Sequence, residues 1–503
     1  MSEKFFMTPA DQPLLTRRSI LARSACGLGS IALSQLLNSE VQAGSPPGER
    51  TSDHESSAPQ TGPRAFTDPL SVKPAHFAAR AKNVIFIFMS GAPSHLDLFD
   101  PKPALNRYHG KAVPEEFLKS LVDPVIKGGA RCFGSPRTFR SYGQSGMQFS
   151  DFATHLGSCA DDLCMIRSMY TTTSNHDPGQ LLMQCGSVLA GLPSMGSWVT
   201  YGLGSESRNL PGFVVLLSNS GEGVDGGTAL WSNGFLSSSY RGVTFRSQGD
   251  PILHLSSPPG FTRSMQRQRL DTVRSMNQQR LAQTGDPEIE ARIDAYELAY
   301  RMQTAAPELV DFSRETSATR AMYGLDNETT RSFGSNCLLA RRMVERGVRF
   351  VQMYHSTWDD HSDLNSHLKK NTDMTDLPAA GLIQDLKQRG LLDETLVIWG
   401  GEFGRTPMHE IRRGTTPGKE GRDHHPFGFT MLLAGGGTRA GYVLGRTDEL
   451  GYHAVEDRVH VHDLQATILH CLGLDHTALT YRYRGRDFRL TDVSGNVVEK
   501  VLS

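Results

Sequence analysis

The chain has 503 residues, enough for one large domain with insertions or for two domains. Lysine and arginine number 52 and aspartate and glutamate number 53, so the formal net charge is −1. This balance argues against nucleic acid or an anionic membrane as the partner, because both usually require a basic surface.

The N-terminal segment contains the three parts of a twin-arginine export signal in order. Arg17 and Arg18 lie in the sequence Thr-Arg-Arg-Ser-Ile-Leu, and a weakly apolar stretch follows over residues 25–37. Val41-Gln42-Ala43 provides small residues for cleavage after Ala43. The apolar stretch is too short and too rich in glycine to span a membrane. We therefore expect a periplasmic or extracellular protein without a transmembrane segment in the mature chain; the alternative is a chance arginine pair in a disordered tail.

This pattern divides the chain into three parts. Residues 1–43 are predicted to be the signal peptide, and residues 44–78, rich in Ser, Pro, Gly and charge, a flexible linker. Residues 79–503 are predicted to form one α/β domain with an insertion around residues 205–345. Within the insertion we expect irregular loops and short strands first, followed by a largely helical segment.

Five apolar runs are predicted to be strands: residues 84–89, 163–169, 348–354, 395–399 and 429–434. The first run has no polar alternation, which is typical of a strand buried on both faces of a parallel sheet. Helical patterns lie between the runs, for example at residues 379–389 and 461–472, each followed by a glycine. The alternation predicts a central mixed, mostly parallel sheet with helices on both faces.

Polar clusters lie at one end of each predicted strand. They occupy residues 90–97, 173–178 and 355–361 after the first three strands, 402–405 after the fourth, and 422–425 just before the fifth. Ligand sites in such sheets gather at the carboxyl ends of the strands. One sheet would therefore bring together clusters that lie far apart in the sequence, which predicts an active site.

Histidine combined with carboxylates is the usual ligand set for zinc, manganese or iron, whereas carboxylates with few histidines favour calcium or magnesium. We therefore predict a site for one or two divalent metal ions, with zinc expected and manganese or calcium as alternatives. The expected ligands are His95, Asp97, Asp359, His361, Glu402, Asp423 and His424. Two such ions could clamp a phosphate or sulfate group.

Other polar residues receive catalytic or binding roles. His176 is the expected nucleophile or acid–base, with Ser174 as a nearby alternative. Arg405 is expected to hold the substrate anion through its planar fork of donors. His355 and His425 are expected to bind substrate. Each assignment has a structural alternative, because a single His or Asp in a loop is more often a helix cap or a satisfied surface group.

Six cysteines remain after the predicted leader, at positions 132, 159, 164, 185, 337 and 471. An even number in an exported protein permits disulfides, and buried free thiols are the alternative. The absence of a Cys-x-x-Cys pair argues against a zinc ribbon.

Several segments resemble the family called domain of unknown function 1501, which consists of exported bacterial proteins. The matching segments are Phe99–Pro103, Glu402–Pro407, Gly421–His424, Leu433–Gly437 and Gly445–Glu449. The resemblance covers the leader and residues from about 80 to about 500. It implies a sulfatase-like fold of the alkaline phosphatase superfamily, and it implies no established activity.

The wider resemblance to sulfatases is partial. Lys82–Ile85, Tyr170–Gly186 and Asp385–Ile398 resemble their opening strand, their nucleophile segment and the helix and strand before their metal motif. However, His176-Asp177-Pro178 replaces the nucleophile motif, and Glu402-Phe403 replaces an Asp-His pair. Formylglycine chemistry is therefore not expected.

Taken together, these features predict an exported metal-dependent hydrolase of sulfate or phosphate esters, with a small anionic ester or a sulfated glycan as its partner. One alternative is a non-catalytic binding protein that recognises an anionic glycan on the same scaffold. The other is an envelope protein whose clusters are structural, which a metal site with no open coordination position would favour.

Overall fold

The computed structural model describes residues 68–118, 131–218, 224–246, 252, 260–410 and 418–503. The predicted signal peptide and most of the predicted linker lie outside these residues. No helix within the described ranges combines the length and apolar character needed to cross a membrane.

A nine-stranded sheet forms the centre of the protein, in the order β12-β4-β11-β8-β1-β7-β5-β6, with β15 also paired to β4. Its strands are β1 (Asn83–Met89), β4 (Leu163–Tyr170), β5 (Phe213–Leu217), β6 (Val243–Phe245), β7 (Phe350–His355), β8 (Thr395–Gly400), β11 (Phe429–Ala434), β12 (Tyr442–Leu444) and β15 (Val459–His460). Every pairing is parallel except the two made by β11. The predicted α/β class with a mixed, mostly parallel sheet is confirmed.

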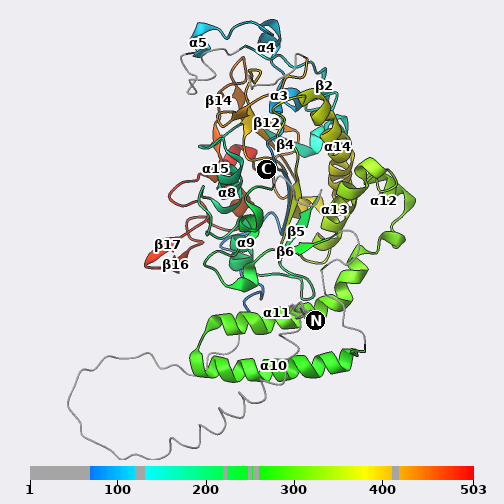
Figure 1. Ribbon diagram of the computed structural model, residues 1–503, viewed down its shortest axis with the longest axis vertical. Coiled ribbons are helices and arrows are strands. Elements are labelled where there is room, and N and C mark those ends of the chain that lie inside the picture. The colour runs from blue at the N-terminus through cyan, green and yellow to red at the C-terminus, as the bar shows by residue number, and fades with distance from the viewer. Residues whose placement is uncertain (1–67, 119–130, 219–223, 247–251, 253–259, 411–417) are drawn as a thin grey trace, which may run out of the picture. The chain divides into compact units, whose positions relative to one another are not determined.

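Helices cover both faces of this sheet because β1 is apolar on both sides. Ile85, Ile87 and Met89 pack into the cluster that contains α13 (Glu328–Val344) and α14 (Leu364–Gln388). The alternate residues of β1 pack into the cluster that contains α8 (His176–Cys185), α9 (Met195–Leu203) and α15 (Val461–Cys471). Figure 1 shows the two groups of helices on opposite sides of the sheet.

The five predicted strands are present, and the structure adds four more to the sheet. Two of these, β5 and β6, lie within residues 205–345, where irregular loops and short strands were expected. β5 is a short apolar run whose neighbours, β7 and β6, bury it. The helix predicted from residue 379 begins earlier, at Leu364, and continues through Pro378, although proline usually interrupts a helix.

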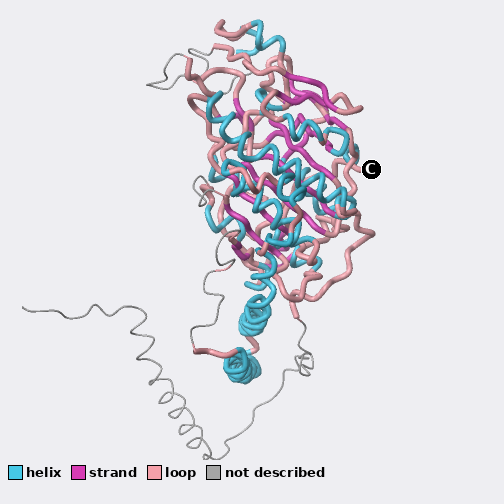
Figure 2. Tube along the Cα trace, turned by 90° about the vertical axis from the view of Figure 1, so that its right-hand side faces the viewer, coloured by secondary structure: helices cyan, strands magenta, loops and turns pink. Residues whose placement is uncertain are grey.

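Two long helices, α10 (Arg263–Thr284) and α11 (Pro287–Val310), pair with one another. Gly285 ends α10 in the left-handed conformation, with φ of 65°. Asp286 then caps α11 by accepting a hydrogen bond from the backbone of Glu288, and Pro287 takes the first helical position. These residues form a tight turn, and both views show the helices side by side (Figure 1 and Figure 2).

Short elements complete the described structure. They are α3 (His95–Leu98), α4 (Pro103–Arg107), α5 (Glu115–Leu118), α7 (Thr154–Ser158), α12 (Ser317–Met322), β2 (Phe139–Tyr142), β3 (Met147–Ser150), β9 (Gly404–Arg405), β10 (His424–His425), β13 (Arg446–Thr447), β14 (Ala454–Glu456), β16 (Tyr481–Tyr483) and β17 (Arg486–Phe488). All six cysteines of the described ranges are buried free thiols. The structure therefore favours the second of the two expectations for these residues, free thiols and not disulfides.

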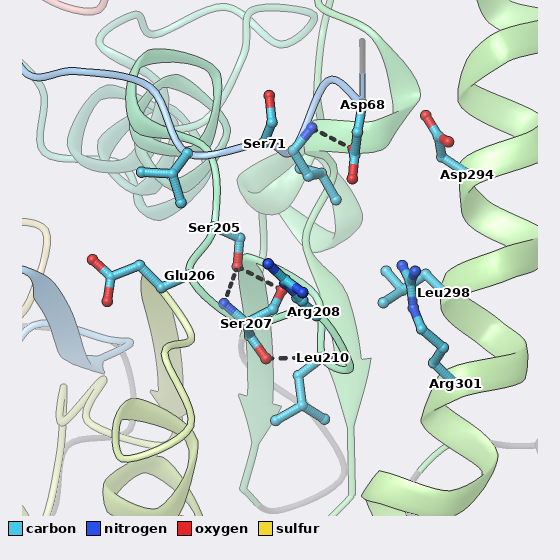
Figure 3. A pocket seen from close by; sticks show the side chains of 12 residues that line it. Asp68, Ser71, Ser205, Glu206, Ser207, Arg208, Leu210, Asp294, Leu298 and Arg301 are labelled. Atoms are coloured by element: carbon cyan, nitrogen blue, oxygen red, sulfur yellow. Dashed lines mark hydrogen bonds between the residues drawn. The ribbon is translucent and has the colours of Figure 1, made fainter. Parts of the chain in front are cut away.

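A cavity of about 620 Å³ lies between α11 and the segments 68–72 and 205–210 (Figure 3). Asp294 projects from α11 into its wall, and its Oδ2 has no hydrogen-bond partner among the described residues. Burial and the nearby carboxylates of Asp68 and Glu290 raise the pKa of Asp294 to about 7. The folded protein therefore disfavours the ionised form of this group.

Asp294→Asn is expected to stabilise the protein at about pH 8 but not at about pH 4. The unfolded chain releases this proton near pH 3.8, whereas the folded chain keeps it to about pH 7. The free energy of unfolding of the wild type therefore falls as the pH rises between these values. That of Asp294→Asn does not fall for this reason, because asparagine does not ionise. Urea unfolding should show a gain of about 1 kcal/mol at the higher pH, because solvent screening reduces the effect of this half-buried group. An equal gain at both pH values would contradict the assignment.

Candidate metal centre

Strand direction brings the polar segments to one edge of the sheet. β4, β8, β1 and β7 run in one direction and β11 runs in the opposite direction. The carboxyl ends of the four strands therefore lie beside the start of β11. His176, Asp359 and Glu402 follow β4, β7 and β8, while His424 precedes β11. The reversed direction of β11 explains why the fifth polar segment stands before its strand.

Three histidines converge on one carboxylate oxygen at this edge. The Nε2 atoms of His176, His361 and His424 lie 3.2, 2.8 and 3.1 Å from Oδ1 of Asp359. One ligand atom from each of the four residues lies within 4.8 Å of the others. Imidazole nitrogens and one carboxylate oxygen at this spacing fit a zinc-type site, which uses about four such donors. We call these four residues the metal centre.

Buried carboxylates lie behind two of the histidines. Nδ1 of His176 donates to Oε1 of Glu402 at 2.6 Å, and Nδ1 of His361 donates to Oε2 of Glu410. Both glutamates are buried. A carboxylate on the far nitrogen fixes the orientation of a ligating histidine and directs its Nε2 lone pair toward the ion. The pairing therefore favours coordination through Nε2.

The protonation of the centre reflects the same contacts. Burial lowers the pKa of His176, but its contacts with Asp359 and Glu402 outweigh burial and raise the pKa to about 9. Burial would raise the pKa of Asp359, yet the three histidines and Arg405 hold it well below its usual value. The ionised carboxylate thus stabilises positive charge at the centre, whether that charge is carried by protons or by a metal cation.

Two glycines allow the loops of the centre to approach closely. A Cβ at Gly91 would lie 2.6 Å from the backbone nitrogen of Asp359, and the φ of Gly91 is 108°. Its amide also donates to Oε1 of Glu402 at 3.0 Å. A Cβ at Gly421 would lie 2.1 Å from the carbonyl carbon of His361. Larger residues at either position would push the ligand loops apart.

The model of one protein family matches residues 81–502, which is most of the chain. The family is described as protein of unknown function (DUF1501). The chain belongs to this family. Among curated proteins none matches it.

Solved structures give distant matches. The lipoteichoic acid synthase LtaP from Listeria monocytogenes is 9% identical with a TM-score of 0.34, covering 84% of this chain and 78% of its own. The PsFucS1 sulfatase from Pseudoalteromonas sp. is 12% identical with a TM-score of 0.29, covering 78% and 68%. Alkaline phosphatase from the Antarctic bacterium TAB5 is 12% identical with a TM-score of 0.28, covering 72% and 94%. Likeness at this level says nothing about the chemistry of the DUF1501 chain.

Arg405 does not face a substrate. It is fully buried, and its Nε and Nη1 donate to the carbonyls of Ala92 and Arg422 at 2.9 and 3.0 Å. Its Nη2 donates to the carbonyl of Gly91 and, at 2.6 Å, to Oδ1 of Asp359. The expectation that this guanidinium holds the substrate anion is corrected: every nitrogen is engaged within the protein, and Arg405 positions Asp359.

Asp97 and His95 also lie outside the metal centre. The Asp97 carboxylate pairs with Arg422, whose Nε lies 2.7 Å from Oδ2, and both residues are buried. The Asp97 carboxylate was expected to bind metal, but its oxygens are engaged by Arg422. His95 is buried with neither ring nitrogen bonded to a described residue, and burial lowers its pKa to about 4. It packs instead against Gly404.

His355 and His425 also lie outside the metal centre. His355 is buried, and its Nδ1 accepts a hydrogen bond from Trp358 at 3.0 Å. His425 is buried against the carbonyl of Tyr452. These positions exclude the expected contact of both histidines with substrate. Ser174 is half-buried, and no described residue of the centre bonds to it.

Two further carboxylates complete the surroundings. Glu402, expected as a ligand, lies behind His176, and its buried Oε2 has no described partner. Asp423 lies 3.9 Å from Nδ1 of His361 and forms a second potential ligand group with His361 and Glu410. The sequence analysis did not predict Glu410 as a site residue, because a single glutamate in the loop after Glu402 belongs to no motif that would distinguish it from a surface residue.

Proposed function

We propose that this protein is a metal-dependent hydrolase of sulfate or phosphate esters, with its reaction at His176, Asp359, His361 and His424. The convergence of three imidazole nitrogens on one carboxylate oxygen carries the proposal. The centre is also open to solvent, because the Asp359 side chain is 42% exposed and the histidines are 13–15% exposed.

The residues of the chain prepare the centre for an anionic substrate. A divalent cation bound there would supply Lewis-acid polarisation of an ester oxygen and lower the pKa of water. Glu402 and Glu410 keep the Nδ1 protons, so that the Nε2 atoms face the cation. Arg405 fixes Asp359. Helix α8 begins at His176, and the partial positive charge of its N-terminus adds to the attraction for an anion.

The site of action is proposed from the sequence. Residues 1–43 would direct export through the twin-arginine route, so the enzyme would act in the periplasm or outside the cell. Export in the folded state would allow the metal to be acquired beforehand.

Elemental analysis of the purified full chain should find about one or two divalent ions per molecule, with zinc expected from the donor set. The loaded protein is then assayed with p-nitrophenyl sulfate and p-nitrophenyl phosphate, and the chelator-treated protein serves as the control. Hydrolysis that is lost with the metal and restored by it would support the proposal. A metal-free protein after loading would refute it, and bound metal without hydrolysis would favour a binding protein.

A further inference from the structure

A second cavity, of about 600 Å³, lies at the end of the sheet near α4 and β14. Two segments that the metal centre does not use, residues 100–103 and 446–449, supply much of its wall. Arg167 of β4 lines the same cavity. No residue of the metal centre is among the lining residues, so any binding here is separate from the proposed reaction.

Arg167 is a partly buried cation, and Asp100 is a described carboxylate whose charge acts on it. Its Nε donates to the thioether sulfur of Met165 at 3.3 Å, and no described carboxylate lies within ion-pair distance of the guanidinium. Burial lowers the pKa of Arg167. Charges that are partly removed from water are normally paired, so a guanidinium that makes no ion pair with a described carboxylate can bind an external anion at the cavity wall.

Two of the three acidic residues of the wall, Asp100 and Asp448, are engaged within the protein; the third is Glu449. Asp100 pairs with Lys102 at 3.1 Å and accepts a hydrogen bond from the hydroxyl of Thr447 at 2.5 Å. The Asp448 carboxylate accepts hydrogen bonds from three backbone amides at 2.7 to 3.0 Å. Lys102 therefore compensates the charge of Asp100, and backbone amides satisfy the oxygens of Asp448, whereas Arg167 and the exposed Arg107 form no ion pair with a described carboxylate.

We propose that this cavity binds a tetrahedral oxyanion, the phosphate or sulfate group of a small molecule, with Arg167 as its principal contact. The planar guanidinium can bind two oxygens of such a group at once. The exposed Arg107 adds positive charge at the same wall. The volume is typical of a small-molecule site and exceeds the need of a free inorganic ion, so the anion belongs to a ligand about the size of a sugar unit.

The test uses the full chain after removal of metal with EDTA, titrated calorimetrically with sodium sulfate, sodium phosphate, glucose 6-sulfate and glucose 6-phosphate at constant ionic strength. Saturable binding is expected, tighter for the sugar esters than for the inorganic ions. The preferred ester identifies the anion. Because the metal is absent, failure of the metal-dependent hydrolase proposal would leave this result unchanged.

Arg167→Met is expected to weaken binding by at least about tenfold, since it removes charge-assisted hydrogen bonds. Arg167→Lys should recover part of the affinity, because it restores charge without the fork. Arg107→Gln, on an exposed side chain that cannot threaten folding, should weaken binding a few-fold, and the exposed Arg140→Met should leave it unchanged. Absence of saturable binding, or equal affinity in wild type, Arg167→Met and Arg107→Gln, would overturn the proposal.

Discussion

Replacing His361 by alanine is expected to reduce the zinc affinity of the protein by about a hundredfold or more, because the change removes one donor of the metal centre. His361 lies nearest to the shared oxygen, with Nε2 at 2.8 Å from Oδ1 of Asp359. Two imidazoles and one carboxylate would remain, so the zinc would lose one of its four protein donors. The affinity is measured by competition with a chromophoric chelator, starting from the metal-free protein.

The matched control for this prediction is His155→Ala, which alters an exposed histidine at the start of α7. It should bind zinc as the wild type does. The metal-dependent increase in melting temperature should also disappear in His361→Ala, because a ligand that binds only the folded state stabilises it in proportion to occupancy. Unchanged zinc affinity in His361→Ala would remove this residue from the metal centre and with it the proposed arrangement of ligands.

The sequence predicts the site's location more reliably than the roles within it. Apolar runs locate five strands, and sheet geometry requires the polar segments at their ends to meet. Among the residues of the metal centre, Asp359, His361 and His424 were expected as metal ligands, whereas His176 was expected as nucleophile or acid–base. Their convergence depends on the reversed direction of β11, which no local pattern reveals.

The roles of the remaining charged residues could not be predicted, because they depend on long-range pairing. Arg405 has the chemistry of an anion-binding residue, but the carbonyls of Gly91 and Ala92, far away in sequence, occupy its donors. Glu402 could ligate a metal or support a histidine, and only the position of His176 decides. Identical side chains thus serve different purposes according to neighbours that the fold alone supplies.

The role of Asp97 is also set by a distant partner, Arg422, and the loss of this ion pair is expected to destabilise the protein strongly. Asp97→Asn is expected to lower the free energy of unfolding by about 3 kcal/mol, because it leaves the buried guanidinium of Arg422 without a counter-charge. The side chains of Arg422 and Asp97 are 0% and 2% exposed. The same substitution at Asp487, in an exposed pair with Arg482 at 3.1 Å, should cost less than about 1 kcal/mol and is the matched control.

Metal content distinguishes this ion pair from a ligand role. If Asp97 only pairs with Arg422, Asp97→Asn should be destabilised to the same extent with and without metal and should keep the wild-type metal stoichiometry. If Asp97→Asn instead loses metal while the metal-free protein remains as stable as the wild type, Asp97 is a metal ligand. Urea unfolding of both forms, combined with elemental analysis, separates the two outcomes.

The pH dependence of the same variant gives an independent check. Burial would raise the pKa of Asp97, but Arg422 and the hydroxyl of Ser94 outweigh it and hold the pKa below its usual value. The ionised carboxylate therefore stabilises the fold above the pKa of the unfolded chain, and this stability is lost as the pH falls through the folded pKa. The difference between wild type and Asp97→Asn should be constant from about pH 8 to about pH 5 and shrink below about pH 4. A difference that persists unchanged in acid would mean that the substitution acts through packing and not through the charge of Asp97.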